Sequence, residues 1–337
     1  MSDDSVGSGA PDAMVYAENL VKIYKSSEIE VVALQGLDLV VKSGELTAII
    51  GNSGSGKSTL LNIIGGLDIP SAGRIEVDGQ DLTKFTDKDF IRYRRETVGF
   101  VWQNVARNLV PYLNALENVE IPMFLASGSV GVTEGARDEE ASAMMGSGAR
   151  ERRRRAKELL GMVDLSHRMY SKLSELSGGE QQRVAIAIGM ANLPKLLLAD
   201  EPTGNVDSGT AGTIFKAFRK MNSSYGVTVI VVTHDRRISR AVDRVVAIRD
   251  GRTSSEFIRR AVHAEDLASL GSIADEDAET HEELAVLDRA GRLQLPREYL
   301  EALGLAGQNK IKVEMEGDRI VLKPPPRSPG SHEESGS

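Results

Sequence analysis

The chain has 337 residues, with 41 basic and 49 acidic side chains, a formal net charge of −8 and no cysteine. This length allows a large core and two domains. The absence of cysteine excludes disulfides, zinc–thiolate sites and cysteine catalysis. The excess of acidic residues excludes the overall basic surface that favours binding to nucleic acid. No apolar run approaches the roughly 18 residues that cross a bilayer, and the polar, acidic N-terminus does not fit a signal peptide, so we expect a soluble, intracellular protein whose membrane role, if any, comes through a partner.

The N-terminal part of the chain predicts a short tail followed by strands. Residues 1–13 are rich in Ser, Gly and Asp and are expected to be disordered. Residues 15–41 alternate apolar and polar side chains, as half-buried strands do. Tyr24 lies between the first two of these strands. It is either an ordinary strand aromatic or a flat face on which a nucleotide base stacks.

The next stretch predicts a phosphate-binding loop. An apolar run over 46–50 reads as a buried strand, and the run from Leu60 reads as a helix that ends at Gly65–Gly66. Between them stand Gly51, Asn52, Ser53, Gly54, Ser55, Gly56, Lys57, Ser58 and Thr59. Glycines let several backbone N–H groups converge on one anion at a helix N-terminus. Lys57 would supply charge for the β- and γ-phosphates and Ser58 a ligand for Mg²⁺, whereas the alternative is a glycine-rich turn that binds nothing.

A region that we expect to be mostly helical follows the strand that ends at Gln103 and runs over residues 104–176. Inside it, residues 127–149 are of low complexity and predict a flexible insertion. Four consecutive arginines, 152–155, follow this segment. We interpret them as a solvated helix face rather than a contact with anionic lipid head groups.

The motif Leu176-Ser177-Gly178-Gly179-Glu180 opens the next predicted helix. Ser177 and Glu180 have the spacing of a capping box. The two glycines are poor helix formers, and they make sense if bare N–H groups at this helix start approach an anion.

Two buried strands then end in polar residues. The run 196–201 ends in Asp200 and Glu201, and because burying charge is costly, carboxylates at the end of a strand usually face a cation or a reaction. Asp200 suits Mg²⁺ through water, and Glu201 suits a base that orients the attacking water. The run 227–233 ends at His234, which could sense a γ-phosphate, and a hairpin over 244–252 closes the domain.

With these motifs in view, the chain from about Ala13 to Ile258 resembles the ATP-binding subunit of an ABC transporter. The resemblance implies an α/β P-loop NTPase core over residues 14–260, with an antiparallel β subdomain and a helical subdomain at about 104–176. It identifies 51–59 as the Walker A loop, Asp200 as the end of Walker B, Glu201 as the catalytic carboxylate and Asp207 as part of the D-loop. It also identifies Gln103 as the Q-loop residue and a metal ligand, His234 as the switch histidine and Tyr24 as the aromatic A-loop residue. Ser177, Gly178, Gly179 and Glu180 form the signature motif, with Glu180 where glutamine is commoner.

The sequence around these motifs is similar to that of the lipoprotein-release and macrolide-export group, notably in Ala115 to Val119 and Leu198 to Asn205. Two departures stand out: the segment 127–149, and Ile188–Gly189 where that group usually has Arg-Ala. The resemblance implies that two copies hold ATP and Mg²⁺ between the Walker loop of one and the signature motif of the other. It further implies a membrane permease partner, so that the chain would be cytoplasmic and peripheral on the inner face of the cell membrane.

A second module is expected beyond the acidic linker 261–283. Residues 284–323 predict two short strands, a helix opened by Pro296 and a final hairpin that turns at 316–318, and residues 324–337 are expected to be a disordered tail. The run Leu287 to Pro296 resembles the swapped-hairpin domain of the AbrB/MazE group, many members of which bind DNA. Since acidic and basic residues are nearly balanced in the module, we expect dimerisation rather than binding to DNA.

Other readings remain open at this stage. The alternative to a transport ATPase is a soluble ABC ATPase with a DNA-binding or regulatory C-terminal module. No heptad run for a coiled coil appears, and only one ATPase cassette is present. Nucleic acid is therefore the less expected partner.

Overall fold

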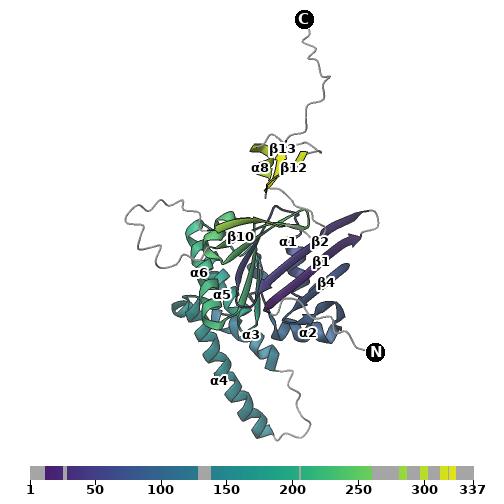
Figure 1. The fold of residues 1–337 in the computed structure, drawn as a ribbon. Helices are drawn as coiled ribbons and strands as arrows, with labels where there is room; N and C mark the ends of the chain where they lie inside the picture. Colours follow the sequence, from purple (N-terminus) through teal and green to yellow (C-terminus); the bar gives the residue numbers. More distant parts are fainter. Residues whose placement is uncertain are drawn as a thin grey trace, which may run out of the picture. The chain divides into compact units, whose positions relative to one another are not determined.

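The computed structural model describes residues 12–25, 29–127, 138–204, 206–259, 281–286, 297–302, 312–317 and 319–323 (Figure 1). It divides into one unit that ends at Leu284 and a second that begins at Ala285. All but the last two residues of the expected N-terminal tail and the whole C-terminal tail lie outside the described residues, as does the linker up to residue 280.

A largely parallel sheet forms the centre of the first unit. Its strand order is β11-β10-β9-β3-β8-β7-β6, and the pairs from β9 to β6 are parallel whereas β10 runs antiparallel to β9. The strands are β3 (Leu46–Ile50), β6 (Val98–Val101), β7 (Leu196–Asp200), β8 (Thr228–Thr233), β9 (Arg244–Arg249), β10 (Arg252–Arg259) and β11 (His281–Ala285). β9 and β10 confirm the predicted hairpin.

A second, antiparallel sheet in the order β2-β1-β4-β5 forms the β subdomain. It contains β1 (Ala13–Lys25), β2 (Glu30–Lys42), β4 (Ala72–Val77) and β5 (Gln80–Asp81). Tyr24 lies within β1, opposite Val31 of β2, and so not between two strands as we expected.

Helices cover the parallel sheet. They are α1 (Lys57–Ile64), α2 (Asp87–Glu96), α3 (Ala115–Ser127), α4 (Asp138–Met162), α5 (Gly178–Gly189) and α6 (Ser208–Tyr225), with the short 3-10 turns η1 (Leu82–Lys84), η2 (Val105–Arg107), η3 (Ser166–Arg168), η4 (Leu173–Glu175) and η5 (Arg236–Ala241). The region 104–176 is therefore largely helical, as predicted. The prediction of a flexible insertion over 127–149 is wrong for its second half, because α4 already begins at Asp138; helix-forming Ala, Glu and Met residues there outweigh the scattered glycines.

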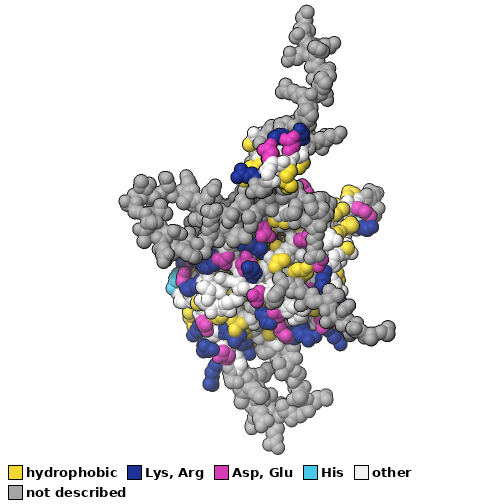
Figure 2. Space-filling model, in the orientation of Figure 1, with side chains coloured by type: hydrophobic (Ala, Val, Ile, Leu, Met, Phe, Trp, Pro, Cys, Tyr) yellow, Lys and Arg dark blue, Asp and Glu magenta, His cyan; other side chains and the backbone are white. Residues whose placement is uncertain are grey.

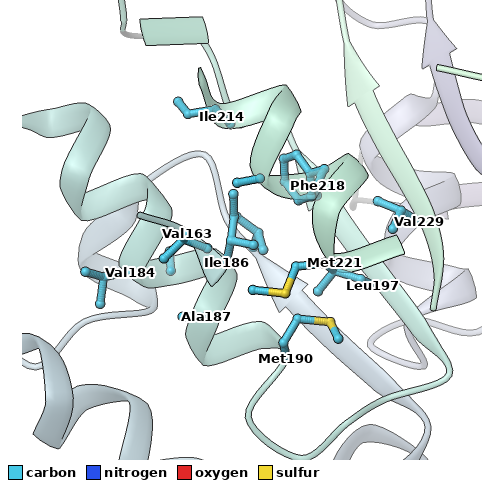
Figure 3. Close-up of a cluster of buried hydrophobic side chains, with 14 of the residues drawn as sticks. Val163, Val184, Ile186, Ala187, Met190, Leu197, Ile214, Phe218, Met221 and Val229 are labelled. Carbon is cyan, nitrogen blue, oxygen red and sulfur yellow. The ribbon is translucent and has the colours of Figure 1, made fainter. Parts of the chain in front are cut away.

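Two hydrophobic clusters lie on the two faces of the parallel sheet. In β7, Leu197 and Ala199 contribute to one cluster whereas Leu196 and Leu198 contribute to the other, as the alternation of strand side chains requires. The first cluster packs the sheet against α3, α4, α5 and α6, with Phe218 and Met221 of α6 against Ile186 and Met190 of α5 (Figure 3). The second cluster packs the sheet against α1, α2 and the antiparallel sheet. The carboxyl ends of β3, β7 and β8 are held rigidly between these layers.

The second unit contains α8 (Arg297–Ala302) and the antiparallel pair β12 (Lys312–Glu316) and β13 (Arg319–Lys323). This pair confirms the predicted final hairpin, and Gly317 has the positive φ of 65° that the turn requires. The first strand expected in the module, residues 285–287, is not found as predicted, because residues 281–285 form β11 at the edge of the parallel sheet and Val286 belongs to no strand. The last three residues of the expected linker, 281–283, are therefore part of a strand. Leu287 lies outside the described residues. The second expected strand, Pro296 and the stretch 303–311 lie outside the described residues.

Candidate ATP-binding and hydrolysis site

The predicted phosphate loop connects β3 to α1, and two of its glycines pack where no side chain would fit. Gly56 precedes the helix with a φ of 97°, and a Cβ there would lie 2.5 Å from the carbonyl oxygen of Ala33. At Gly51 a Cβ would lie 2.3 Å from the carbonyl oxygen of Ile248. The loop is therefore shaped by close backbone contact with β2 and β9. Its residues 51–55 line a polar pocket together with His234 and residues of β9.

Lys57 is held inside this loop. Its Nζ donates to the carbonyl oxygens of Gly51 and Asn52 at 2.8 and 2.9 Å. Burial lowers the pKa of the Lys57 ammonium, and the charges of Glu201 and Asp200 oppose that shift. A buried cation with nearby carboxylates is thus in place at the start of α1, where the helix dipole also favours an anion.

Ser58 and Asp200 come together at the sheet edge, although 142 residues separate them. The Ser58 hydroxyl donates to Asp200 Oδ1 at 3.3 Å. Burial raises the pKa of the Asp200 carboxyl, which a bound cation would offset. Among the residues that the structure describes, no group of three or more His, Cys, Asp or Glu side chains could hold a metal ion. A hydroxyl and one carboxylate are nevertheless donors that fit Mg²⁺, which takes its other ligands from water and substrate phosphates.

Glu201 and His234 form a pair at the ends of the neighbouring strands β7 and β8. His234 Nδ1 lies 2.8 Å from Glu201 Oε2. The Glu201 backbone has a φ of 44°, which is rare for a residue with a side chain, and its N–H donates to the carbonyl oxygen of Val232 at 2.8 Å. Strained backbone of this kind concentrates at functional sites. The Glu201 side chain is 15% exposed and that of His234 is 67% exposed, so the pair spans the boundary between protein and solvent.

Gln103 follows β6, which ends two residues earlier than the sequence predicted, at Val101. The Gln103 side chain is exposed and its Nε2 lies 3.3 Å from where a Cβ on Gly204 would stand. It therefore lies against the turn that follows Glu201. Lys57, Ser58, Gln103, Asp200, Glu201 and His234 together are termed the Walker half of the site.

The signature motif begins α5 and satisfies its own polar groups. Ser177 N–H donates to Glu180 Oε2 at 2.8 Å, and Glu180 N–H donates to Ser177 Oγ at 3.3 Å. These bonds form the predicted capping box, and the backbone bond from Ser177 is the main reason that the pKa of the Glu180 carboxyl is lowered. Arg168 pairs with Glu180 at 3.6 Å.

The two signature glycines differ in their surroundings. A Cβ at Gly178 would meet nothing within 4 Å, whereas a Cβ at Gly179 would lie 2.1 Å from Cγ2 of Thr210 in α6. Asp207 caps α6, because its Oδ1 accepts from Thr210 N–H at 3.0 Å. Gly179 is therefore needed for packing inside this chain, whereas Gly178 faces open space. Ser177, Gly178, Gly179, Glu180 and Asp207 together are termed the signature half.

The structure does not bring the two halves into contact within one chain. Across the described ranges, no hydrogen bond or ion pair joins the signature half to the loop 51–59. Asn205 of the D-loop lies outside these ranges. A site that used both halves would need two copies of the chain.

Tyr24 is placed by residues that the sequence did not single out. Its hydroxyl donates to Asp68 Oδ2 at 2.7 Å, and Lys22, whose Nζ lies 4.9 Å from the Tyr24 ring centroid, pairs with Asp68. Burial raises the pKa of Tyr24, as does the bond to Asp68, while a bond to Thr59 at the end of the loop lowers it. The aromatic ring thus lies beside the phosphate loop. No sequence signal pointed to Asp68, which is 44 residues away.

Comparison with known proteins agrees with this geometry. The family model described as ABC transporter matches residues 34–204. The chain is 41% identical over 251 residues to a lipoprotein-releasing system ATP-binding protein LolD from Xylella fastidiosa, covering 74% of this chain and 96% of that protein. It is 41% identical over 238 residues to a macrolide export ATP-binding/permease protein MacB from Syntrophobacter fumaroxidans, covering 71% of this chain and 31% of that protein.

A solved structure shows the same fold. The chain matches the dimeric structure of a post-hydrolysis state of the ATP-binding cassette MJ0796 bound to ADP and Pi, with a TM-score of 0.61 and 41% identity. The match covers 74% of this chain and all of that one. A curated relative of the same designation, from Methanocaldococcus jannaschii, is 42% identical over 244 residues, which cover 72% of this chain and 96% of that protein.

Within the described part of the chain, no helix is both long and apolar enough to pass through a membrane. The motifs, the fold and the relatives agree. The chain belongs to the ABC transporter family and is one of its ATP-binding, ATP-hydrolysing subunits, of the group that includes the lipoprotein-release and macrolide-export proteins.

Proposed function

We propose that the Walker half binds Mg²⁺·ATP and that Glu201 is the base of its hydrolysis. The observation that carries this assignment is the placement of the Glu201–His234 pair beside the Ser58–Asp200 pair at the carboxyl ends of adjacent strands. Glu201 would accept a proton from the attacking water, whose oxygen bonds to the γ-phosphorus. The bond between that phosphorus and the β–γ bridging oxygen breaks, which gives ADP and phosphate.

The other residues of the Walker half have supporting roles in this proposal. Lys57 neutralises the β- and γ-phosphates, and Ser58, Asp200 and Gln103 would hold Mg²⁺, which supplies charge neutralisation when bound. His234 would orient Glu201 through the 2.8 Å contact and would lie beside the γ-phosphate of a bound nucleotide. Tyr24 offers its ring to the adenine base.

The signature half would complete the site of a second copy. Ser177, Gly178 and Gly179 present a helix N-terminus whose open side has room for a phosphate, and Glu180 and Asp207 fix its position. In this arrangement ATP lies between two chains, and binding closes the pair. Glu201→Gln should then retain ATP affinity but lose roughly 10³-fold or more in kcat, because the base is lost while the phosphate contacts remain.

The test is turnover and ATP binding measured side by side on the same preparation of Glu201→Gln. Near-normal turnover in the variant would contradict the assignment of the base. Exposed Glu96→Gln, on α2 and outside the site, is the matched control and should behave as the parent chain does.

We further propose that the chain powers a separate membrane permease from the cytoplasmic face of the membrane. Relatives named for lipoprotein release and macrolide export support this partner. On the face shown in Figure 2, acidic and basic side chains are interspersed, which does not favour a phosphate backbone as the partner.

The C-terminal unit would be a dimerisation module over residues 284–323 that tethers two copies through the linker 261–283. In the β12–β13 hairpin, the cross-strand pairs Val313–Leu322 and Met315–Ile320 share one face. Val313, Met315 and Ile320 are 63%, 74% and 69% exposed, and an isolated hairpin with such a face is marginal in water. A second copy would bury this face and raise the effective concentration of the ATPase units.

Deletion of the chain after Ala285, which keeps β10 and β11 in the parallel sheet, tests the tether. Light scattering without nucleotide should find the truncated protein monomeric and the full chain dimeric. A full chain that is monomeric at micromolar concentration would contradict the tether and favour the alternative, a regulatory or DNA-binding module.

A further inference from the structure

Three side chains, one in the strand β6 and two beyond it, stack on one another as a ladder: Phe100, Trp102 and Arg107. The rings of Phe100 and Trp102 are parallel within 5°, with their centroids 4.7 Å apart. The guanidinium carbon of Arg107 lies 5.3 Å from the Trp102 ring centroid. This is the geometry of a cation–π contact, which holds an exposed arginine in one place.

The backbone that carries the ladder is also fixed. Asn108 Oδ1 accepts from Trp102 N–H at 2.9 Å, and Asn108 Nδ2 donates to the carbonyl oxygen of Phe100 at 2.9 Å. Asn104 caps the turn η2, since its Oδ1 accepts from Ala106 N–H at 3.0 Å. The turn that ends in Arg107 is therefore preorganised by two asparagine side chains.

Strand register places this ladder at the ATP site. Val101 pairs with Ala199 in the parallel β6–β7 ladder, so Trp102 and Asp200 follow side by side at the carboxyl edge of the sheet. The turn η2, which ends at Arg107, follows this edge, and the Arg107 guanidinium stacks on Trp102 there. Within the described residues, Arg107 has no carboxylate at ion-pair distance. A cation with no ion-pair partner among the described residues is thus held against Trp102, next to the strand end that carries Asp200.

We propose that Arg107 is a second basic residue of the ATP site, which binds the terminal phosphate of a nucleoside triphosphate and so discriminates ATP from ADP. The inference rests on the proposed function and deepens it. Lys57 approaches the phosphates from the loop 51–59, whereas Arg107 approaches them from the turn after Gln103. Its planar guanidinium suits the oxygens of a terminal phosphate.

The experiment uses the full chain carrying Glu201→Gln as the parent, so that ATP is not consumed. Affinities for Mg²⁺·ATP and Mg²⁺·ADP are measured by calorimetry in this parent and with Arg107→Ala, Arg107→Gln or Arg107→Lys added. We expect Ala and Gln to weaken ATP binding about tenfold, the loss of one charge-assisted contact, and to leave ADP binding within about twofold. Lys should restore part of the ATP affinity.

Trp102 is the single tryptophan of the chain and gives a second readout. In the parent, Mg²⁺·ATP should change the indole emission because a terminal phosphate binds to the guanidinium that lies over the ring, and Mg²⁺·ADP should change it less. Arg107→Ala should abolish the difference between the two nucleotides. Arg92→Ala, which removes an exposed arginine paired only locally with Asp89, is the control and should leave both readouts as in the parent.

An ATP-to-ADP affinity ratio in Arg107→Ala and Arg107→Gln equal to that of the parent would overturn the proposal. An acidic group on another protein would then be the better partner for Arg107. Failure of the parent itself to bind ATP would contradict the proposed function and the inference together, so the two failures are distinguishable.

Discussion

The Walker half and the signature half of this site differ in how the protein stabilises their charged side chains. In the Walker half, burial lowers the pKa of Lys57 and raises the pKa of Asp200, so both charged forms are disfavoured without ligand. In the signature half, the Glu180 and Asp207 carboxyls have lowered pKa values because hydrogen bonds from Ser177 and Thr210 satisfy them. The charged groups of the Walker half would be stabilised by a bound phosphate and cation, whereas those of the signature half are already stabilised by hydrogen bonds within the chain.

This difference shows how one chain can carry two halves of a site that do not meet. Binding of ATP and Mg²⁺ would stabilise the charged forms of the buried side chains in the Walker half, and this stabilisation would contribute to the free energy of binding. The signature half needs only to keep a helix N-terminus rigid and open until a second copy presents its nucleotide. Substitutions can therefore separate stability within a chain from activity between chains.

Substitutions at the two glycines of the signature motif should separate the effect on stability from the effect on activity most strongly. Gly178→Ala adds a Cβ in open space, so the melting temperature of the nucleotide-free protein should stay within about 2 °C of the parent. Its kcat should fall about 10²-fold, because the added methyl group would stand where the nucleotide of the other copy lies. Gly179→Ala should lower the melting temperature, since its Cβ would collide with Thr210.

Thermal unfolding and steady-state ATP turnover on the two variants check this prediction. Gly212→Ala in α6, which also points its Cβ into open space, is the matched control and should keep full activity. Normal turnover in Gly178→Ala would show that the signature motif does not face nucleotide.

Replacing a carboxylate in each half should give a smaller difference, in the melting temperature of the nucleotide-free protein. The folded-state pKa of Asp200 is raised, so its ionised form costs stability at neutral pH. Asp200→Asn should therefore raise the melting temperature of the nucleotide-free protein by about 1–3 °C. Asp207→Asn should give no gain, because hydrogen bonds lower the pKa of Asp207 and already favour its charged form.

The melting temperatures of the two variants should depend on pH in opposite ways. The cost of ionised Asp200 is fully present above its raised pKa and disappears as the pH falls through that value, so the advantage of Asp200→Asn should shrink in acid. The contribution of Asp207 is lost only at lower pH, through its lowered pKa. An Asp200→Asn advantage that grew on acidification would contradict the comparison.

Local signals were enough to predict most of the Walker half. The apolar run 46–50 forms a strand as predicted, and the run predicted as a strand over 196–201 forms one that ends a residue earlier, at Asp200. Lys57 begins the helix after the first strand, and Asp200, Glu201 and His234 stand where β7 and β8 end. The capping box of Ser177 and Glu180 follows from their spacing alone. These features are determined by residues that are close together in the sequence, so local sequence patterns are sufficient to predict them.

Features that depend on tertiary contacts were not predictable. The contact of Tyr24 with Asp68 joins β1 to the turn after α1. The position of Arg107 near the strand end of Asp200 follows from the β6–β7 register and from its stacking on Trp102. The beginning of α4 at Asp138 was missed because glycine and serine in the segment 127–149 suggested a flexible stretch. Even so, the family resemblance from Ala13 to Ile258 includes the residues 34–204 that the family model matches.

The central claim, that ATP lies between the Walker half of one copy and the signature half of another, can be tested by cross-linking because the chain has no cysteine. Ser53→Cys in one preparation and Ser174→Cys in another place thiols at exposed positions next to the two halves. In Glu201→Gln chains mixed and treated with a short bismaleimide, we expect a Ser53–Ser174 cross-linked pair that forms with Mg²⁺·ATP and not with Mg²⁺·ADP. Cross-linking that is the same with either nucleotide, or absent with both, would contradict the shared site.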